Sequence, residues 1–193
     1  MIESHRDDHL RTLWLNVCHH NDAASYEILF HSLNAPLIKF SMQYIHTRHT
    51  AEEIVIDVFL KCWNNRAELT HVNNPKTYLY TAVKNQSLNY LKKFSMVRYV
   101  ELDQSGNYEL IDTADPQLIM EKKELLKKLD DTIESLPPQS RMVFKLIKDD
   151  GLKYKEVAQL LEISPKTVQN HLFSAISKLN KRLKIYMEKA SAK

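Results

Sequence analysis

Apolar residues recur every three or four positions along most of the chain, the spacing that places side chains on one face of an α-helix. A clear example is the segment TAEEIVIDVFLKCWNN. Its apolar positions are Ile54, Val55, Val58, Phe59, Cys62 and Trp63. Thr50 stands before this run and Glu53 follows three residues later, which is the capping-box pattern at a helix start. The segment therefore predicts a helix capped by Thr50.

Two further helices are expected in the first half. One spans residues 23–32 and continues, with a break before Pro36, to about residue 46. The other is NPKTYLYTAVKNQSLNYLKKF, in which Asn74 can cap the helix and Pro75 fits the first helical position, where no N–H is needed.

The pattern changes after residue 94. ELDQSGNYELIDTAD, residues 101–115, has no apolar periodicity and carries five acids but no base, whereas residues 84–98 carry four bases and no acid. We interpret it as an acidic, flexible linker. Four helices are then expected at residues 116–136, 138–148, 153–161 and 165–187, with Gly151 between the second and third.

The last of these helices begins with strong signals. Ser164 can accept a backbone N–H and Pro165 fits the first position. The apolar stripe behind them is Val168, Leu172, Ala175, Ile176, Leu179 and Leu183. Only residues 162–164 separate this helix from the preceding one, which predicts a helix-turn-helix. Glu162 holds the turn position that glycine often fills, although it tolerates a positive φ less well.

The whole chain is expected to be all-α, because two glycines among 193 residues leave few positions for tight sheet turns or phosphate-cradling loops. We expect two small helical domains at residues 1–95 and 116–193, joined by the acidic linker at residues 96–115.

Charge distinguishes the two halves. From residue 137 onward there are 12 lysines and arginines against 5 acids, a net charge of +7, while the preceding part has 15 against 19, a net charge of −4. A basic helix-turn-helix favours DNA as its ligand, although a solvated lysine-rich surface would give the same count. The candidate DNA-binding residues of the last helix are Ser164, Lys166, Thr167, Gln169, Asn170, Phe173, Ser174 and Lys178.

Several other kinds of site are disfavoured. The nine histidines form no H-E-x-x-H or similar ligand set, so we expect surface residues, no metal and no cofactor. No acidic and basic side chains are paired at the spacing of a catalytic site, so we do not expect an enzyme. Cys18 and Cys62 lack zinc-ligand spacing and are interpreted as reduced thiols. With no signal peptide and no apolar run of membrane length, a cytoplasmic protein is expected.

Two blocks of sequence resemble the sigma-70 family of bacterial sigma factors, and specifically its extracytoplasmic-function (ECF) group. TAEEIVIDVFLKCWNNR and TYLYTAVKNQSLNYLKK are similar to region 2 of the family. IESLPPQSRMVFKLIKDDGLKYKEVAQLLEISPKTVQNHLFSAISKL is similar to region 4. Departures from the region 2 and region 4 patterns occur at Tyr78, Val83, Asn89, Lys92 and Ser174. They bear on the promoter sequence more than on the activity.

The resemblance implies a factor that binds core RNA polymerase and directs it to promoters. Region 4 would read the upstream (−35) element as a duplex, and region 2 would capture the melted downstream (−10) element. Candidate single-strand contacts are Tyr78, Tyr80, Lys84, Asn85, Asn89, Tyr90, Lys92 and Lys93. Candidate polymerase contacts are Asp57, Leu60, Lys61, Trp63 and Asn64. Each tyrosine, and Trp63, is equally compatible with a place in the core.

The resemblance also implies an inhibiting anti-sigma factor, usually anchored in the membrane, and a chain that is monomeric when free or 1:1 with its partners. A rival interpretation is a stand-alone helix-turn-helix regulator with an N-terminal sensory or dimerising domain. It explains the C-terminal half but gives no reason for the tyrosines and lysines at residues 78–93. A helical metal-dependent enzyme and a purely structural bundle are weaker alternatives.

Overall fold

A computed structural model of the protein describes residues 2–94 and 127–190, and every regular element in these ranges is helical. The chain divides into two compact units, Met1–Gln104 and Ser105–Lys193. The predicted linker at 96–115, and the predicted helical residues 116–126, lie outside the described residues.

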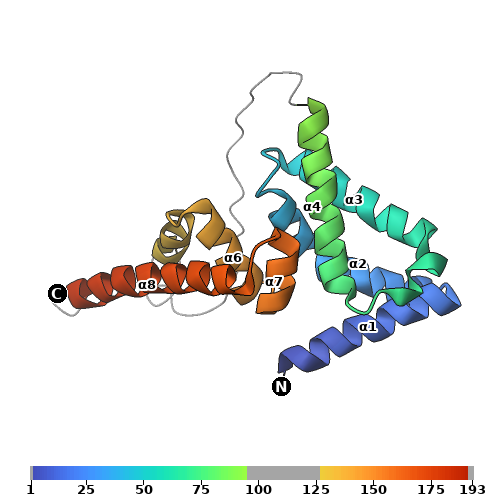
Figure 1. The fold of residues 1–193 in the computed structure, drawn as a ribbon, viewed down its shortest axis with the longest axis horizontal. Helices are drawn as coiled ribbons and strands as arrows, with labels where there is room; N and C mark the ends of the chain where they lie inside the picture. Colours follow the sequence, from blue (N-terminus) through green and yellow to red (C-terminus); the bar gives the residue numbers. More distant parts are fainter. Residues whose placement is uncertain (1, 95–126, 191–193) are drawn as a thin grey trace, which may run out of the picture. The chain divides into compact units, whose positions relative to one another are not determined.

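The first unit is built on one central helix. Its elements are α1 (Ile2–His20), α2 (Ala23–Ser41), α3 (Arg48–Asn64), the 3-10 helix η1 (Arg66–His71) and α4 (Pro75–Phe94). Helix α2 packs against α1, α3 and α4, and α3 also packs against α4 (Figure 1). The core of this unit therefore forms around α2.

Helix α2 runs without interruption through Pro36, so the predicted break is wrong, and the helix ends at Ser41 rather than near residue 46. A proline inside a helix removes one hydrogen bond and crowds the preceding turn. Here Leu33 and Leu37, on either side of Pro36, are both buried. Burial of this apolar face outweighs the local preference for a break.

Helix α1 was not among the predicted elements, although its signal is present in the sequence. Leu10, Leu13, Trp14 and Val17 are spaced as one helical stripe, and all four are buried. The indole Nε1 of Trp14 donates a hydrogen bond to the backbone oxygen of Leu69, at 3.2 Å. Helix α1 is thereby fastened to η1.

The two predicted caps of this unit have opposite outcomes. Helix α3 begins at Arg48, so Thr50 lies inside the helix and the predicted capping box is wrong. Thr47 precedes the helix, and its hydroxyl donates to the hydroxyl of Thr50 at 2.8 Å instead of accepting a backbone N–H. At α4 the prediction is confirmed, because Asn74 Oδ1 accepts the backbone N–H of Thr77 at 3.0 Å.

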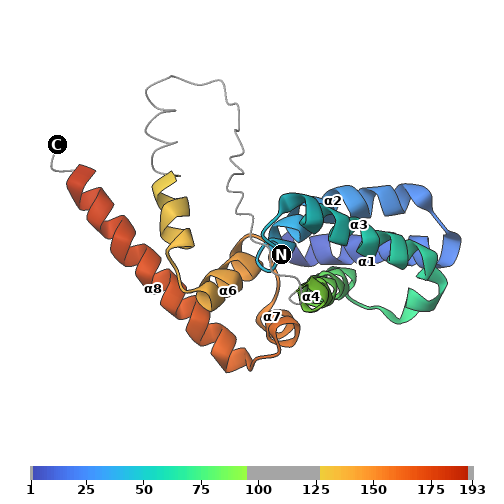
Figure 2. The same cartoon turned by 90° about the horizontal axis from the view of Figure 1, so that it is seen from above.

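The second unit consists of a helical segment at residues 127–134 followed by α6 (Pro138–Lys148), α7 (Tyr154–Leu161) and α8 (Pro165–Ala190). Helix α8 packs against both α6 and α7, with α7 near its N-terminal end (Figure 2). The predicted helices at 138–148, 153–161 and 165–187 match these elements, with α7 starting one residue later and α8 ending three residues later than expected. The described part of the predicted helix at 116–136 ends two residues early, at residue 134.

Replacing the fully buried Leu37 by alanine should destabilise the first unit by about 2–5 kcal/mol, because the lost contacts leave a cavity. Both tryptophans of the chain, Trp14 and Trp63, belong to this unit, so urea unfolding of the full chain followed by tryptophan fluorescence reports on it alone. Ile28→Ala, at a half-exposed position of the same helix, is the matched control. Equal midpoints for the two variants would contradict the assignment of α2 as the central helix.

Candidate nucleic-acid interface

The turn between α7 and α8 closes through the left-handed conformation of a non-glycine residue. Glu162 has φ 57° and ψ 41°. The backbone N–H of Glu162 donates to Gln159 O at 3.3 Å, and that of Ile163 donates to Ala158 O at 3.0 Å. These bonds satisfy carbonyls at the end of α7 in the way that a C-terminal glycine usually permits. Glu162 thus adopts the positive φ that the turn requires, although a non-glycine residue tolerates it less well.

The start of α8 is capped as predicted. Ser164 Oγ accepts the backbone N–H of Thr167 at 3.0 Å and lies 2.8 Å from the Thr167 hydroxyl. Pro165 occupies the first helical position. The entry to the helix is therefore held by its own local sequence.

One stripe of α8 packs inward and the opposite side faces solvent. Val168, Leu172, Ala175 and Leu179 are buried, Ile176 is partly buried, and the Leu183 side chain lies outside the described residues. We call the opposite side the recognition face, and it comprises Lys166, Thr167, Gln169, Asn170, Phe173, Ser174 and Lys178. All are exposed except Thr167 and Ser174, which are partly exposed. The predicted separation of apolar and polar faces is confirmed.

Phe173 is the most exposed large apolar side chain among the described residues, with 76% of its surface accessible. It stands among amide, hydroxyl and ammonium groups of the recognition face. An aromatic ring in this position can contact the methyl group of a thymine.

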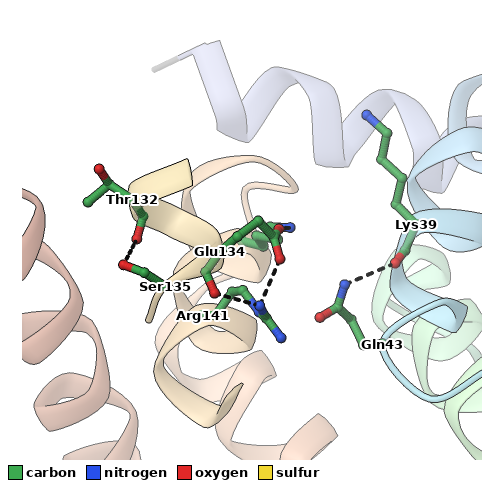
Figure 3. A network of polar contacts seen from close by, with 7 residues as sticks. Lys39, Gln43, Thr132, Glu134, Ser135 and Arg141 are labelled. Carbon is green, nitrogen blue, oxygen red and sulfur yellow. Dashed lines mark hydrogen bonds and ion pairs between the residues drawn. The ribbon is translucent and has the colours of Figure 1, made fainter. Parts of the chain in front are cut away.

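A salt-bridge network joins α6 to the end of the preceding helical segment at residues 127–134. Figure 3 shows Arg141 close to both the backbone oxygen and the carboxylate of Glu134, with Nη1 2.8 and 2.7 Å from the two oxygens. Lys145 Nζ lies 2.6 Å from the other carboxylate oxygen. Burial raises the pKa of Glu134, but the hydrogen bonds and positive charges of Lys145 and Arg141 outweigh burial, so the net pKa is lowered. The carboxylate is thereby kept ionised.

The candidate single-strand contacts on α4 differ in their exposure to solvent. Asn85, Asn89, Lys92 and Lys93 are exposed, and Tyr90 is partly exposed. Tyr78 is partly buried against Trp14, with ring centroids 5.8 Å apart, and burial raises the pKa of its hydroxyl, with a smaller contribution from Cys62.

Two of the candidates require correction. Tyr80 has no exposed surface and packs on Phe40, with centroids 5.0 Å apart, so it cannot stack on a nucleotide base. Lys84 is also buried, with 8% exposed, and presents little surface to a phosphate. Both residues lie on the inward side of α4 because the helical period places them with Leu79 and Val83.

The candidate polymerase contacts lie along one side of α3. Asp57, Leu60, Lys61 and Asn64 are exposed. Ile56 is exposed as well and stands one turn before Leu60, a position that winding α3 at 100° per residue would have identified. We call Ile56, Asp57, Leu60, Lys61 and Asn64 the α3 face.

Trp63 is held between two neighbours rather than projecting freely. Its ring lies 4.9 Å from that of Tyr26, and the Arg66 guanidinium carbon is 4.4 Å from its centroid. Arg66 also donates to Trp63 O and to Asn21 Oδ1, at 2.6 Å each. Since Trp63 remains partly exposed, the structure is compatible with both of its expected roles.

A groove of about 510 Å³ lies between α3 and α4. Ile56 and Asp57 line it from α3, and Asn89, Tyr90 and Lys93 line it from α4. The Lys61 ammonium reaches across to Gln86 Oε1 at 3.3 Å. Asp57 of the candidate polymerase contacts therefore shares this groove with Asn89, Tyr90 and Lys93 of the single-strand contacts.

The thiols are buried and unpaired, at Cys18 and Cys62. Burial, together with the neighbouring Cys18, raises the pKa of Cys62 to about 12. Over residues 2–94 and 127–190, no three His, Cys, Asp or Glu side chains gather where a metal ion could bind. None of the helices described is both long and apolar enough to cross a bilayer.

Two family models match the chain in order. Sigma-70 region 2 matches residues 29–95, which include α3 and α4, and Sigma-70 region 4 matches residues 126–179, which include the helix-turn-helix. The RNA polymerase sigma-H factor of Pseudomonas aeruginosa is 21% identical over 177 residues, covering 88% of this chain and 91% of that protein. The ECF RNA polymerase sigma-E factor of Escherichia coli is 28% identical over 130 residues, covering 64% of this chain and 68% of that protein.

The chain belongs to the sigma-70 family, in its ECF group. It is a sigma factor, and sigma factors act in transcription initiation without being enzymes.

Solved structures share the fold of this sigma factor at low sequence identity. The structure of CnrH in complex with the cytosolic domain of CnrY matches with a TM-score of 0.55 and 15% identity, over 91% of this chain and 98% of that one. The structure of the sigma factor RpoE from Bartonella quintana, in complex with the anti-sigma factor NepR, matches with a TM-score of 0.58 and 17% identity. The match covers 83% of this chain and 97% of that one.

Glycine at position 162 should stabilise the helix-turn-helix. A left-handed conformation costs a non-glycine residue roughly 1–2 kcal/mol, and the extra chain entropy of glycine offsets roughly 0.5–1 kcal/mol of that gain. Hydrogen exchange measured by peptide in Glu162→Gly should therefore slow slightly in α7 and early α8. Glu156→Gly is the matched control, because Glu156 is helical and its carboxylate accepts the Lys153 N–H at 2.8 Å. Faster exchange in both variants would refute the turn geometry.

Proposed function

We propose that this sigma factor binds core RNA polymerase and directs it to promoters with two DNA elements. The observation that carries the proposal is the pairing of two different exposed surfaces with the two matched regions. The recognition face of α8 lies in region 4, and the α3 face with the outer side of α4 lies in region 2. The N-terminal domain at residues 1–95 and the C-terminal domain at residues 116–193 then have separate tasks.

The recognition face is suited to the upstream (−35) element as a duplex. A helix fits the major groove, where lysine can donate to guanine and asparagine or glutamine can pair with adenine. Lys166, Gln169 and Asn170 supply these groups near the start of α8. Ser164, Thr167 and the helix N-terminus are suited to a phosphate, and Lys178 adds attraction that does not depend on sequence.

The outer side of α4 is suited to the melted downstream (−10) element. Asn85 and Asn89 offer hydrogen bonds to an unpaired base, while Lys92 and Lys93 attract the backbone. Tyr78 and Tyr90 are partly exposed, and stacking on bases needs an accessible aromatic residue. Tyr80 and Lys84 are buried, so they do not contact the DNA strand directly in this proposal.

The α3 face is suited to the polymerase. Leu60 and Ile56 expose 53% and 46% of their surfaces between charged neighbours, which is the mixture of apolar centre and polar rim found at protein interfaces. Trp63, stacked under Arg66, supports the end of this face. In this assignment the groove between α3 and α4 belongs to the border between polymerase and DNA.

An anti-sigma factor is the second protein partner we propose. Two solved structures of similar fold are complexes, one with the cytosolic domain of CnrY and the other with the anti-sigma factor NepR. A comparable partner would hold this chain in a 1:1 complex until transcription is needed. The chain would then act in the cytoplasm, where polymerase and promoters are.

Leu60→Ala combined with Asp57→Ala should weaken binding to core RNA polymerase at least tenfold, because a central apolar contact and its charged neighbour are removed together. Size-exclusion chromatography with purified core enzyme measures the 1:1 complex. Ile28→Ala, with 47% exposed, is the control for loss of a half-exposed apolar side chain. If wild-type protein forms no complex and binds a specific duplex alone as a homodimer, the stand-alone regulator is the better explanation.

Lys166→Ala and Asn170→Ala should each change discrimination at one position of the upstream element by about 1–3 kcal/mol. Lys178→Ala serves as the contrast, because loss of a phosphate contact weakens all sequences alike and lowers the slope of log K against log salt by about 0.9. Competition binding of the polymerase complex to a set of single-base variants separates the two effects. A uniform loss in all three variants would mean that Lys166 and Asn170 do not read bases.

A further inference from the structure

A partly buried polar contact joins α6 to the recognition helix. Ser140, on α6, is 4% exposed, and its hydroxyl oxygen lies 3.2 Å from Nδ1 of His171 on α8. Neither residue was a candidate from the sequence. Val143, one turn after Ser140, and Leu172 and Ala175, one and four positions after His171, are all buried and apolar.

Such a contact can control rotation where apolar packing cannot. Apolar burial is non-directional, so it decides which side of a helix faces inward but leaves the finer rotation to packing and to polar contacts. A hydrogen bond is directional, and a buried hydroxyl that loses its partner is penalised. Functional groups need to be held within about 0.5 Å of their working positions, which is a small part of a helical turn.

His171 stands where a rotation of α8 would be felt. It is partly buried and lies between the exposed Asn170 and the buried Leu172, at the border of the recognition face. A rotation of α8 that moved the imidazole would turn the adjacent Asn170 by the same angle. The opposite ring nitrogen, Nε2, does not take part in the contact with Ser140.

We propose that the hydrogen bond between Ser140 and His171 sets the rotation of α8, which makes Ser140 a positioning residue for reading the upstream element. This inference rests on the proposed function, since it assumes that the recognition face reads a duplex. It extends the set of specificity-determining residues to a buried side chain that never touches DNA.

Two substitutions of His171 separate positioning from direct contact. The amide of asparagine reaches the place of Nδ1 and can keep the bond to Ser140, whereas the amide of glutamine reaches the place of Nε2 and cannot. His171→Asn should therefore retain the sequence preference of the wild type. His171→Gln and Ser140→Ala should each reduce discrimination between the preferred upstream duplex and its single-base variants by roughly two- to tenfold, the worth of one hydrogen bond.

The measurement is competition binding by the complex of full-length protein with core RNA polymerase, at fixed salt. Hydrogen exchange in α6 and α8 accompanies it, because a purely structural role would lower protection and overall affinity while leaving discrimination unchanged. Discrimination kept by His171→Gln but lost by His171→Asn would assign the effect to a contact through Nε2 and overturn the proposal. Unchanged discrimination in all variants would overturn it too. A wild-type complex with no preference for any upstream sequence would instead defeat the proposed function.

Discussion

Burial of one apolar stripe of α8 is the interaction on which the geometry of the recognition face depends. Fully burying a valine or leucine side chain contributes about 1.5–3 kcal/mol, and Val168, Leu172 and Leu179 are all buried. An exposed ion pair contributes only about 0–1 kcal/mol. The apolar stripe therefore decides which side of α8 turns inward, and the recognition face is what remains outside. Capping by Ser164 and the left-handed turn at Glu162 then fix where that face begins.

The same competition sorts the residues of the first unit. Helix α4 carries aromatic and basic residues around its whole circumference, and the side that packs on the core takes Tyr80 and Lys84 out of contact with solvent. Asn89 and Lys93 stay exposed because they lie outside the packed side of α4, along the groove between α4 and α3. An aromatic or basic residue in the sequence is thus a potential nucleic-acid contact only after the helix has been placed against its neighbours.

Helical periodicity and capping predicted most of the fold. The boundaries of α6 and the inward stripe of α8 follow directly from local sequence, since the determining contacts are one turn apart. Predictions failed where tertiary packing competes with local preference. Pro36 lies inside a continuous helix because the leucines around it are buried. Thr50 lies inside α3 because that helix starts two residues before it, at Arg48. The contact between Ser140 and His171 joins residues 31 positions apart, which no local pattern reveals.

The proposed function requires one chain to give core RNA polymerase a preference for two separate DNA elements. Transcription from a pool of templates with randomised upstream sequence tests it most directly, with core enzyme alone as the reference. Adding the protein should enrich transcripts whose templates share an upstream and a downstream motif at a fixed spacing. Transcripts drawn evenly from the pool, or a single motif bound equally well without polymerase, would contradict it.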